Sequence, residues 1–403
     1  MTITVTQKPD FRCALSRSAA ISVPKIRKAV EQKGTKETKG KSSHRRQIAT
    51  KPNLAEAFSR RPAIAIIKAL WCFLSLVCCS CVSTQTEDLT LNRYEFEQPE
   101  MGVPFRIVLF APNPPLAQRA ATAAFQRVKQ LNDIMTDYDS DSELSRLSQT
   151  SGQGREVTVS HDLWVVLQRG QELAEQSGGA FDMTVGPYVN LWRQARRQGI
   201  LPDPGRLARA RRSVGYQNVR LDPPRRGVTL LASDMRLDLG GIAKGYAVDQ
   251  ALQVLSRFGV GNALVSGGGD MAVSGPPPGK KGWRIELPPL DATNAPPARF
   301  VVLAQAGIST SGDLFQRLEL NGRRYSHIID PRTGSGLTDH SLVTVIAPND
   351  FTADSLTKVM SVLPPKAALK FIKKRPRAAV RIVRQPGKKI ELYESRQFGS
   401  YYE

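Results

Sequence analysis

The sequence predicts an α+β fold, in which helices pack on antiparallel or mixed sheets. Residues 235–239 alternate apolar and charged side chains as a strand does, and they lead through two glycines into a helical pattern that begins at Ile242. A second strand-like segment, residues 104–110, precedes a helical pattern over residues 116–135. Two more strand-like segments close the chain after consecutive helical patterns. Strands and helices therefore share one body.

The same two periodicities give the other elements in order. Strands are expected at residues 104–110, 219–221, 228–231, 235–239, from 263, and at 283–287, 342–346, 378–383 and 389–393. Helices are expected at residues 116–135, 164–176, from 188, from 242, from 352, and at 365–374.

The glycine pair Gly240-Gly241 precedes the most distinctive helix start. The first N–H groups of a helix are unpaired, so a strand, a glycine turn and a helix start can together bind an anion. Lys244 lies in the first turn, where its charge opposes the helix dipole unless a phosphate or carboxylate is close by. The alternative is a helix start that only packs on a sheet.

The net charge of +21 is concentrated near the N-terminus. Residues 1–81 hold 16 Lys/Arg against 4 Asp/Glu, whereas the other 322 residues hold 41 against 32. No run of basic residues interleaved with aromatics follows, so a nucleic-acid-binding function is excluded.

The first hundred residues are predicted to be a leader and a tether. Residues 1–60 are polar and basic, which indicates disorder. Residues 61–81 combine a positive start, a short apolar core and terminal cysteines, which is typical of a lipoprotein signal peptide with Cys79 or Cys81 lipidated. Residues 82–100 are expected to be a linker. All five cysteines lie within this leader, so we expect an exported protein, lipid-anchored at the periplasmic face of the inner membrane.

Several short motifs follow one another along the remaining chain. They are Met101-Gly102, Tyr138 with the segment 142–146, the segment 177–182, Asp238 to Gly245, Ser266 to Asp270, Thr310 to Asp313, His327 to Pro331, and Ala353-Asp354. In this order they resemble the ApbE family of flavin transferases. The resemblance covers about residues 95–395 and implies one FAD-binding catalytic domain over residues 101–395 with an ApbE-like fold.

The resemblance implies an FAD:protein FMN transferase that uses Mg²⁺. A threonine hydroxyl of an acceptor protein, such as a membrane redox subunit or a flavin-carrying domain, would attack the FAD pyrophosphate and release AMP. By the family's pattern, the FAD contacts would be Met101, Tyr138, Ala180, Phe181, Asp182, Lys244 and Ile328. The carbonyl of Gly241 and the carboxylate of Asp354 would hold the magnesium. Oxygen ligands of this kind suit Mg²⁺.

The roles of four side chains are open or in question. Tyr138 is either an aromatic at the rim or a platform on which a planar ligand stacks. His327 is either the general base for the acceptor hydroxyl or a structural histidine, and Asp354 is an alternative base. Lys358 stands where the family usually has Thr, four residues after Asp354 and on the same helix face. It is therefore expected to weaken Mg²⁺ binding.

Two other functions remain as alternatives. Water in place of the threonine would make the protein an FAD pyrophosphatase that yields FMN and AMP. If Lys358 abolishes the metal site, the protein would be a flavin-binding lipoprotein that carries out no reaction.

Overall fold

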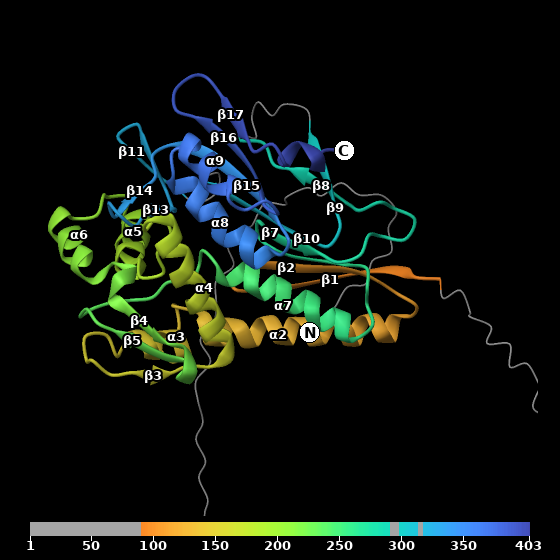
Figure 1. Cartoon of the computed structure of the whole chain (residues 1–403), viewed down its shortest axis with the longest axis horizontal. Coiled ribbons are helices and arrows are strands. Elements are labelled where there is room, and N and C mark those ends of the chain that lie inside the picture. Colours follow the sequence, from red (N-terminus) through yellow and green to blue (C-terminus); the bar gives the residue numbers. More distant parts are fainter. Residues whose placement is uncertain (1–89, 291–297, 313–316) are drawn as a thin grey trace, which may run out of the picture. The chain divides into compact units, whose positions relative to one another are not determined.

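The computed structural model describes residues 90–290, 298–312 and 317–403 (Figure 1). The expected basic extension, residues 1–60, and the expected signal peptide, residues 61–81, lie outside these ranges. The expected linker, residues 82–100, is wrong in its second half, because Asn92–Glu100 forms strand β1. Polar residues alternate there with the buried Tyr94 and Phe96, which is the pattern of a strand with one face on the core.

Most expected elements lie close to their predicted positions, and the structure adds several others, among them β1 and the central strand at Ala306–Gly312. The helices are α2 Pro114–Met135, α3 Glu143–Ser148, α4 His161–Ser177, α5 Gly186–Gln198, α6 Pro204–Ala210, α7 Ala243–Arg257, α8 Asp350–Val362 and α9 Pro365–Lys373. The strands are β1 Asn92–Glu100, β2 Val103–Ala111, β3 Val157–Thr158, β4 Val219–Asp222, β5 Gly227–Leu230, β6 Ala263–Gly267, β7 Asp270–Val273, β8 Trp283–Leu287, β9 Arg299–Leu303, β10 Ala306–Gly312, β11 Arg317–Leu320, β12 Arg323–Ser326, β13 Ile329–Asp330, β14 Ser335–Gly336, β15 His340–Ala347, β16 Ala379–Gln385 and β17 Glu391–Glu394.

One large antiparallel sheet organises these elements. Its eight strands follow the order β1-β2-β6-β7-β10-β15-β16-β17, and every neighbouring pair is antiparallel. A three-stranded sheet, β3-β5-β4, and three two-stranded pairs are separate from it. Because helices pack on antiparallel sheets, the predicted α+β class is confirmed.

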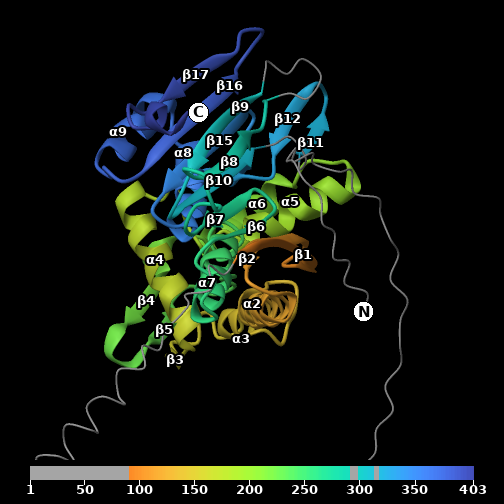
Figure 2. The same cartoon turned by 90° about the vertical axis from the view of Figure 1, so that its right-hand side faces the viewer.

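The two faces of the large sheet are covered differently. Helices α2, α7, α8 and α9 form one layer, with α2 over β1 and β2, α7 over β6 and β7, α8 over β10 and β15, and α9 against β16 (Figures 1 and 2). The hairpin β8–β9 packs on the other face through Trp283 and Val301. Successive side chains of β2 point to opposite faces of the large sheet. Ile107 and Leu109 belong to the hydrophobic core under the helices, and Val108 belongs to the core under the hairpin.

The segment expected to be a strand at residues 235–239 is not one. It runs extended, with only an isolated bridge between Arg236 and Val185. The Asp238 N–H donates to the Met183 carbonyl (2.8 Å) and the Leu237 N–H donates to Ser148 Oγ (3.1 Å). Its backbone polar groups are thus satisfied by loops and a side chain, without a neighbouring strand.

Helices α7 and α8 are in close contact at Gly245. A Cβ added there would lie 2.4 Å from the Asp350 carbonyl oxygen and 2.7 Å from Asp354 Cβ. Only a residue without a side chain allows this approach. It places the start of α7 directly against the first turns of α8.

We predict that Gly245→Ala lowers the free energy of unfolding by about 3 kcal/mol, because the methyl group must separate two packed helices. Urea unfolding followed by circular dichroism measures this change. Gly261→Ala is the matched control, since a Cβ there meets nothing within 4 Å. Equal stabilities of the two variants would contradict the close approach.

Candidate functional site

Three distant segments meet around the start of α7. A Cβ added at Gly241 would lie 3.1 Å from Lys358 Cγ on α8 and 3.5 Å from Phe181 Cε2. Lys358 in turn pairs with Asp354 one turn earlier on α8. We call Phe181, Gly241, Lys244, Asp354 and Lys358 the central site. One side chain, that of Lys358, therefore lies against both residues expected to hold the magnesium.

Asp354 is fully buried, and both its oxygens have donors. Lys358 Nζ donates to Oδ1 (2.9 Å) and the Gly245 N–H donates to Oδ2 (3.1 Å). Burial alone would raise the pKa of Asp354. The charges of Lys358 and Lys244 and these two hydrogen bonds outweigh burial, so its pKa lies below the ordinary value. Asp354 is therefore an ionised carboxylate at neutral pH.

Lys244 is anchored to the large sheet. Its ammonium donates a hydrogen bond to Oδ2 of Asp270. Asp270 is the first residue of β7. The other oxygen of Asp270 accepts from Ser309 Oγ (2.6 Å), and Ser309 stands opposite Asp270 on β10. Opposite charges raise the pKa of Lys244 despite its burial, so the side chain stays charged.

Asp249, Asp270, Asp350 and Asp354 form a cluster of buried or half-buried carboxyl groups, which we call the acidic cluster. Asp249 accepts from the N–H groups of Asp350 (2.9 Å) and Phe351 (2.8 Å) and so caps α8 together with Asn349. Asp350 is fully buried, and neither of its carboxyl oxygens has a hydrogen-bond partner. Burial and the neighbouring carboxylates raise the pKa of Asp350 well above its usual value, which keeps this group neutral.

The segment 180–182 is held from within the protein. Ala180, Phe181 and Asp182 are all buried. Asp182 Oδ1 accepts from the N–H and hydroxyl of Thr184 (2.8 and 2.7 Å), and Oδ2 accepts from the Tyr216 N–H (2.8 Å). The carboxylate thus fixes the turn, and the turn places Phe181 against Gly241. Direct contact of these three residues with a ligand stays a prediction.

Tyr138 is the most exposed of the predicted ligand contacts, at 80%. The Arg193 guanidinium of α5 lies 4.4 Å from the ring centroid, so one ring face rests on a cation. Arg193 also bonds to Asp137 and to Asp238 Oδ2 (3.2 Å). Asp238 accepts the Gly240 N–H (2.8 Å), so Arg193 joins the tyrosine loop to the glycine turn.

The other predicted residues occupy turns. Met101 and Gly102 form the two-residue hairpin turn between β1 and β2, with positive φ angles of 49° and 75°. His327 is half-buried in the bend between β12 and β13, and Ile328 beside it is buried. The roles predicted for these residues remain untested by the structure.

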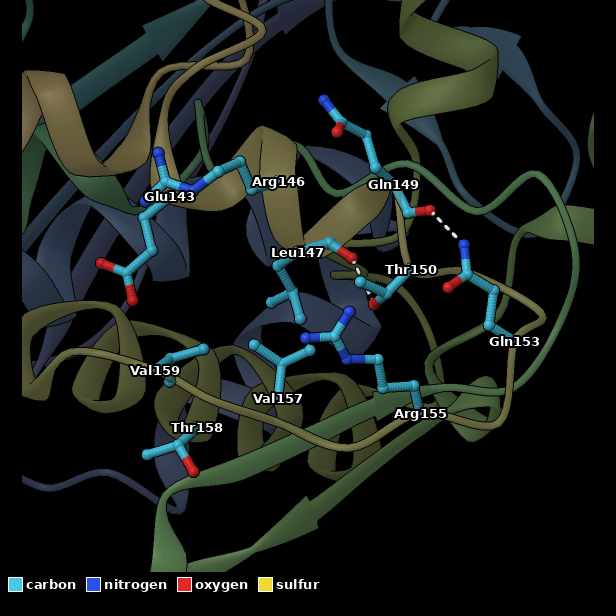
Figure 3. A pocket seen from close by; sticks show the side chains of 10 residues that line it. All are labelled: Glu143, Arg146, Leu147, Gln149, Thr150, Gln153, Arg155, Val157, Thr158 and Val159. Carbon is cyan, nitrogen blue, oxygen red and sulfur yellow. Dashed lines mark hydrogen bonds between the residues drawn. The ribbon is translucent and has the colours of Figure 1, made fainter.

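Two cavities of the described structure are lined by no residue of the central site. One, of about 520 Å³, is lined by residues of α3 and the segment 155–159, including Glu143, Arg146 and Arg155 (Figure 3). The other, of about 700 Å³, lies between Ser177 of α4 and helix α9. Ser177 Oγ accepts the Phe181 N–H (3.1 Å), so the second cavity adjoins the segment 180–182.

Sequence comparison matches this chain to one family. The model of the ApbE family covers residues 101–382, which includes every predicted site residue. The chain belongs to the ApbE family. Among relatives, the FAD:protein FMN transferase of Haemophilus influenzae is 34% identical over 263 residues, covering 64% of this chain and 76% of the relative. The enzyme of the same name from Escherichia coli K12 is 31% identical over 277 residues, covering 67% and 78%.

Solved structures of the family share the fold. The flavin transferase ApbE from Vibrio cholerae superposes with a TM-score of 0.70 at 26% identity, over 77% of this chain and 99% of that one. The apo flavinyl transferase ApbE of Pseudomonas stutzeri gives a TM-score of 0.68 at 28% identity, over 77% and 97%. The predicted family and fold are confirmed.

Sequence reasoning missed several residues of this region. No role is predicted from the sequence for Arg193, Asp249 or Asp350. Asp270 belongs to one of the motifs, but the motif assigns it no role. The partners of Arg193 lie 56 and 45 residues away, so no local pattern indicates the contact. Asp249 lies on the helix that carries Lys244, and only the fold shows that it caps a second helix.

We predict that Asp249→Asn removes part of the pH dependence of stability. Burial raises the pKa of Asp249 from its usual 3.8 to about 6. The protonated group therefore contributes stability that is fully present below pH 3.8 and is lost as the pH rises through about 6. Between these limits wild type should lose up to about 3 kcal/mol more than the variant.

Urea unfolding at several pH values measures this difference. Asp203→Asn is the control, because Asp203 is an exposed cap of α6 outside the acidic cluster. Parallel pH profiles for wild type and Asp249→Asn would contradict the prediction.

Proposed function

We propose that this protein is an FAD:protein FMN transferase. One observation carries the proposal. Three segments that carry family motifs, at Phe181, at Gly241 to Gly245 and at Asp354, meet at the junction of α7 and α8. Relatives over 30% identical bear the same functional name.

The proposed reaction transfers the FMN unit of FAD through its phosphorus atom. The hydroxyl oxygen of an acceptor threonine forms a bond to the phosphorus of the FMN half of FAD. The bond between that phosphorus and the bridging oxygen breaks, and AMP leaves with this oxygen. The hydroxyl proton passes to a base. The products are a phosphoester-linked FMN and AMP, so the atoms balance.

Residues of the central site would stabilise the charge that develops on the phosphates. Lys244 remains charged and lies in the first turn of α7, where the helix dipole also favours an anion. Asp354 is held by two donors and stays ionised, so we assign it a positioning role. We keep His327 as the proton acceptor, since a histidine pKa lies near neutral pH.

The geometry gives little support to the expected magnesium site. Gly241 and Asp354 offer oxygen ligands in one place, as Mg²⁺ requires. However, the ammonium of Lys358 already bonds to Asp354 Oδ1 (2.9 Å), and the lysine stem fills the space beside Gly241. Among the described residues, no group of three or more His, Cys, Asp or Glu side chains could hold a metal ion. These residues as arranged do not fit the ion, and no step is assigned to it.

We further propose that the protein is exported and lipid-anchored through Cys79 or Cys81, at the periplasmic face of the inner membrane. The apolar segment that ends in these cysteines supports this location. It lies outside the residues that the structure describes, and no helix within them could cross a membrane. An acceptor at the membrane, such as a redox subunit or a flavin-carrying domain, would then be within reach.

We predict that the purified protein, given FAD and acceptor proteins from its own source, yields a flavin-labelled band on a denaturing gel. His327→Gln should slow the labelling about 10²–10⁴-fold, the usual contribution of a general base, while FAD binding is retained. His161→Gln is the control, because His161 is exposed at the start of α4. AMP release without labelled protein would identify a pyrophosphatase, and FAD binding without AMP release would identify a flavin-binding protein without catalysis.

We predict that Tyr138→Ala weakens FAD binding about tenfold, because stacking on an aromatic ring is worth about 1–3 kcal/mol. Tyr138→Phe keeps the ring above Arg193 and should retain wild-type affinity. Quenching of flavin fluorescence on titration measures both values. An unchanged affinity for Tyr138→Ala would place the flavin elsewhere.

A further inference from the structure

Lys358 occupies the position where a divalent cation would bind Asp354. Its ammonium donates to Asp354 Oδ1 (2.9 Å) and to Thr357 Oγ1 (3.0 Å), and its side chain is 18% exposed. We propose that this ammonium is the resident cation of the central site and replaces a dedicated Mg²⁺ site in this protein.

The space beside Asp354 supports this assignment. Mg²⁺ binds oxygen at about 2.0–2.1 Å and requires nearly ideal octahedral geometry. An ion at that distance from Oδ1 would meet the like charge of Nζ, which bonds to the same oxygen. The other oxygen, Oδ2, already accepts the Gly245 N–H. While Lys358 keeps its place, an ion at Oδ1 therefore meets a like charge, and one of the two acceptor positions of Oδ2 is already taken.

The stem of Lys358 closes the opposite side of the site. Its Cγ lies 3.1 Å, and its Cε 3.6 Å, from the position of a Cβ at Gly241. The lysine methylenes therefore fill the space between the Gly241 backbone and α8. The chain thus places both the charge and the bulk of one side chain between the two groups that would have to share an ion.

Neighbouring side chains hold Lys358 in this position. Thr357 is fully buried, and its hydroxyl donates to the Asp354 carbonyl (2.6 Å) while it accepts from Nζ. If Lys358 turned away, Asp354 would keep a buried negative charge without its nearest cation, which is strongly unfavourable. An incoming ion would have to offset that loss before it gained any affinity.

The test compares Mg²⁺ binding to wild type and to Lys358→Thr by isothermal titration calorimetry without FAD. The wild type should show no saturable binding in the low millimolar range, and Lys358→Thr should bind Mg²⁺ at least about tenfold more tightly. Asp354→Asn added to Lys358→Thr should abolish the gain. Lys366→Thr, at an exposed lysine of α9, should behave as wild type. Saturable binding by wild type that Lys358→Thr does not improve would overturn the proposal.

Lys358→Ala covers the case in which Lys358→Thr fails to fold. It removes both the charge and the stem, so Mg²⁺ should raise its thermal unfolding midpoint while leaving that of wild type unchanged. Equal responses of the two proteins would overturn the proposal.

The consequence for the flavin rests on the proposed function. EDTA should leave the FAD affinity of wild type unchanged and should lower that of Lys358→Thr in the presence of Mg²⁺. The calorimetric comparison needs neither FAD nor an acceptor, so a failure of FMN transfer and a failure of the lysine proposal are distinguishable.

Discussion

The contact between α7 and α8 at Gly245 is the constraint on which the site depends. Because residue 245 has no side chain, its N–H reaches Asp354 Oδ2 and the backbone of α8 passes within contact distance. This approach places Asp354 beside the glycine turn that precedes α7. Without it, the glycine turn and the first turns of α8 would be separate features of two neighbouring helices. The large sheet beneath them supplies the spacing, since α7 and α8 each cover a different pair of strands.

The packing of α7 against α8 also determines which carboxyl groups of the acidic cluster are ionised. Four carboxyl groups share one end of two helices with only two lysines nearby. Lys244 balances Asp270, and Lys358 balances Asp354. Asp350 has no ion-pair partner and remains neutral, while Asp249 uses its oxygens to cap α8. Each of the two lysines thus pairs with one ionised carboxylate of the acidic cluster. These pairs connect α7 to β7 and stabilise the first turns of α8.

Much of the fold followed from the sequence, because hydrophobic period is a local property. The helix patterns and the strand at residues 283–287 match the structure closely. The exceptions depended on distant partners. Residues 235–239 alternate like a strand but bond to loops, and residues 92–100 look polar but gain a buried face only by pairing with β2. For the site, three of the motif segments, at residues 181, 241–245 and 354, lie together, and the roles predicted for their residues stay predictions. The role of Arg193 and the isolation of Asp350 arise from tertiary packing and have no sequence signature.

Arg193 has a wider consequence for how a ligand is sensed. Its guanidinium supports the ring of Tyr138, grips Asp137 and reaches Asp238, whose carboxylate holds the Gly240 N–H. One planar cation therefore couples an exposed aromatic surface to the backbone that precedes α7. A ligand that contacts both the Tyr138 ring and the glycine turn would therefore contact two groups that Arg193 connects. The binding free energies of the two halves of such a ligand would then not be additive.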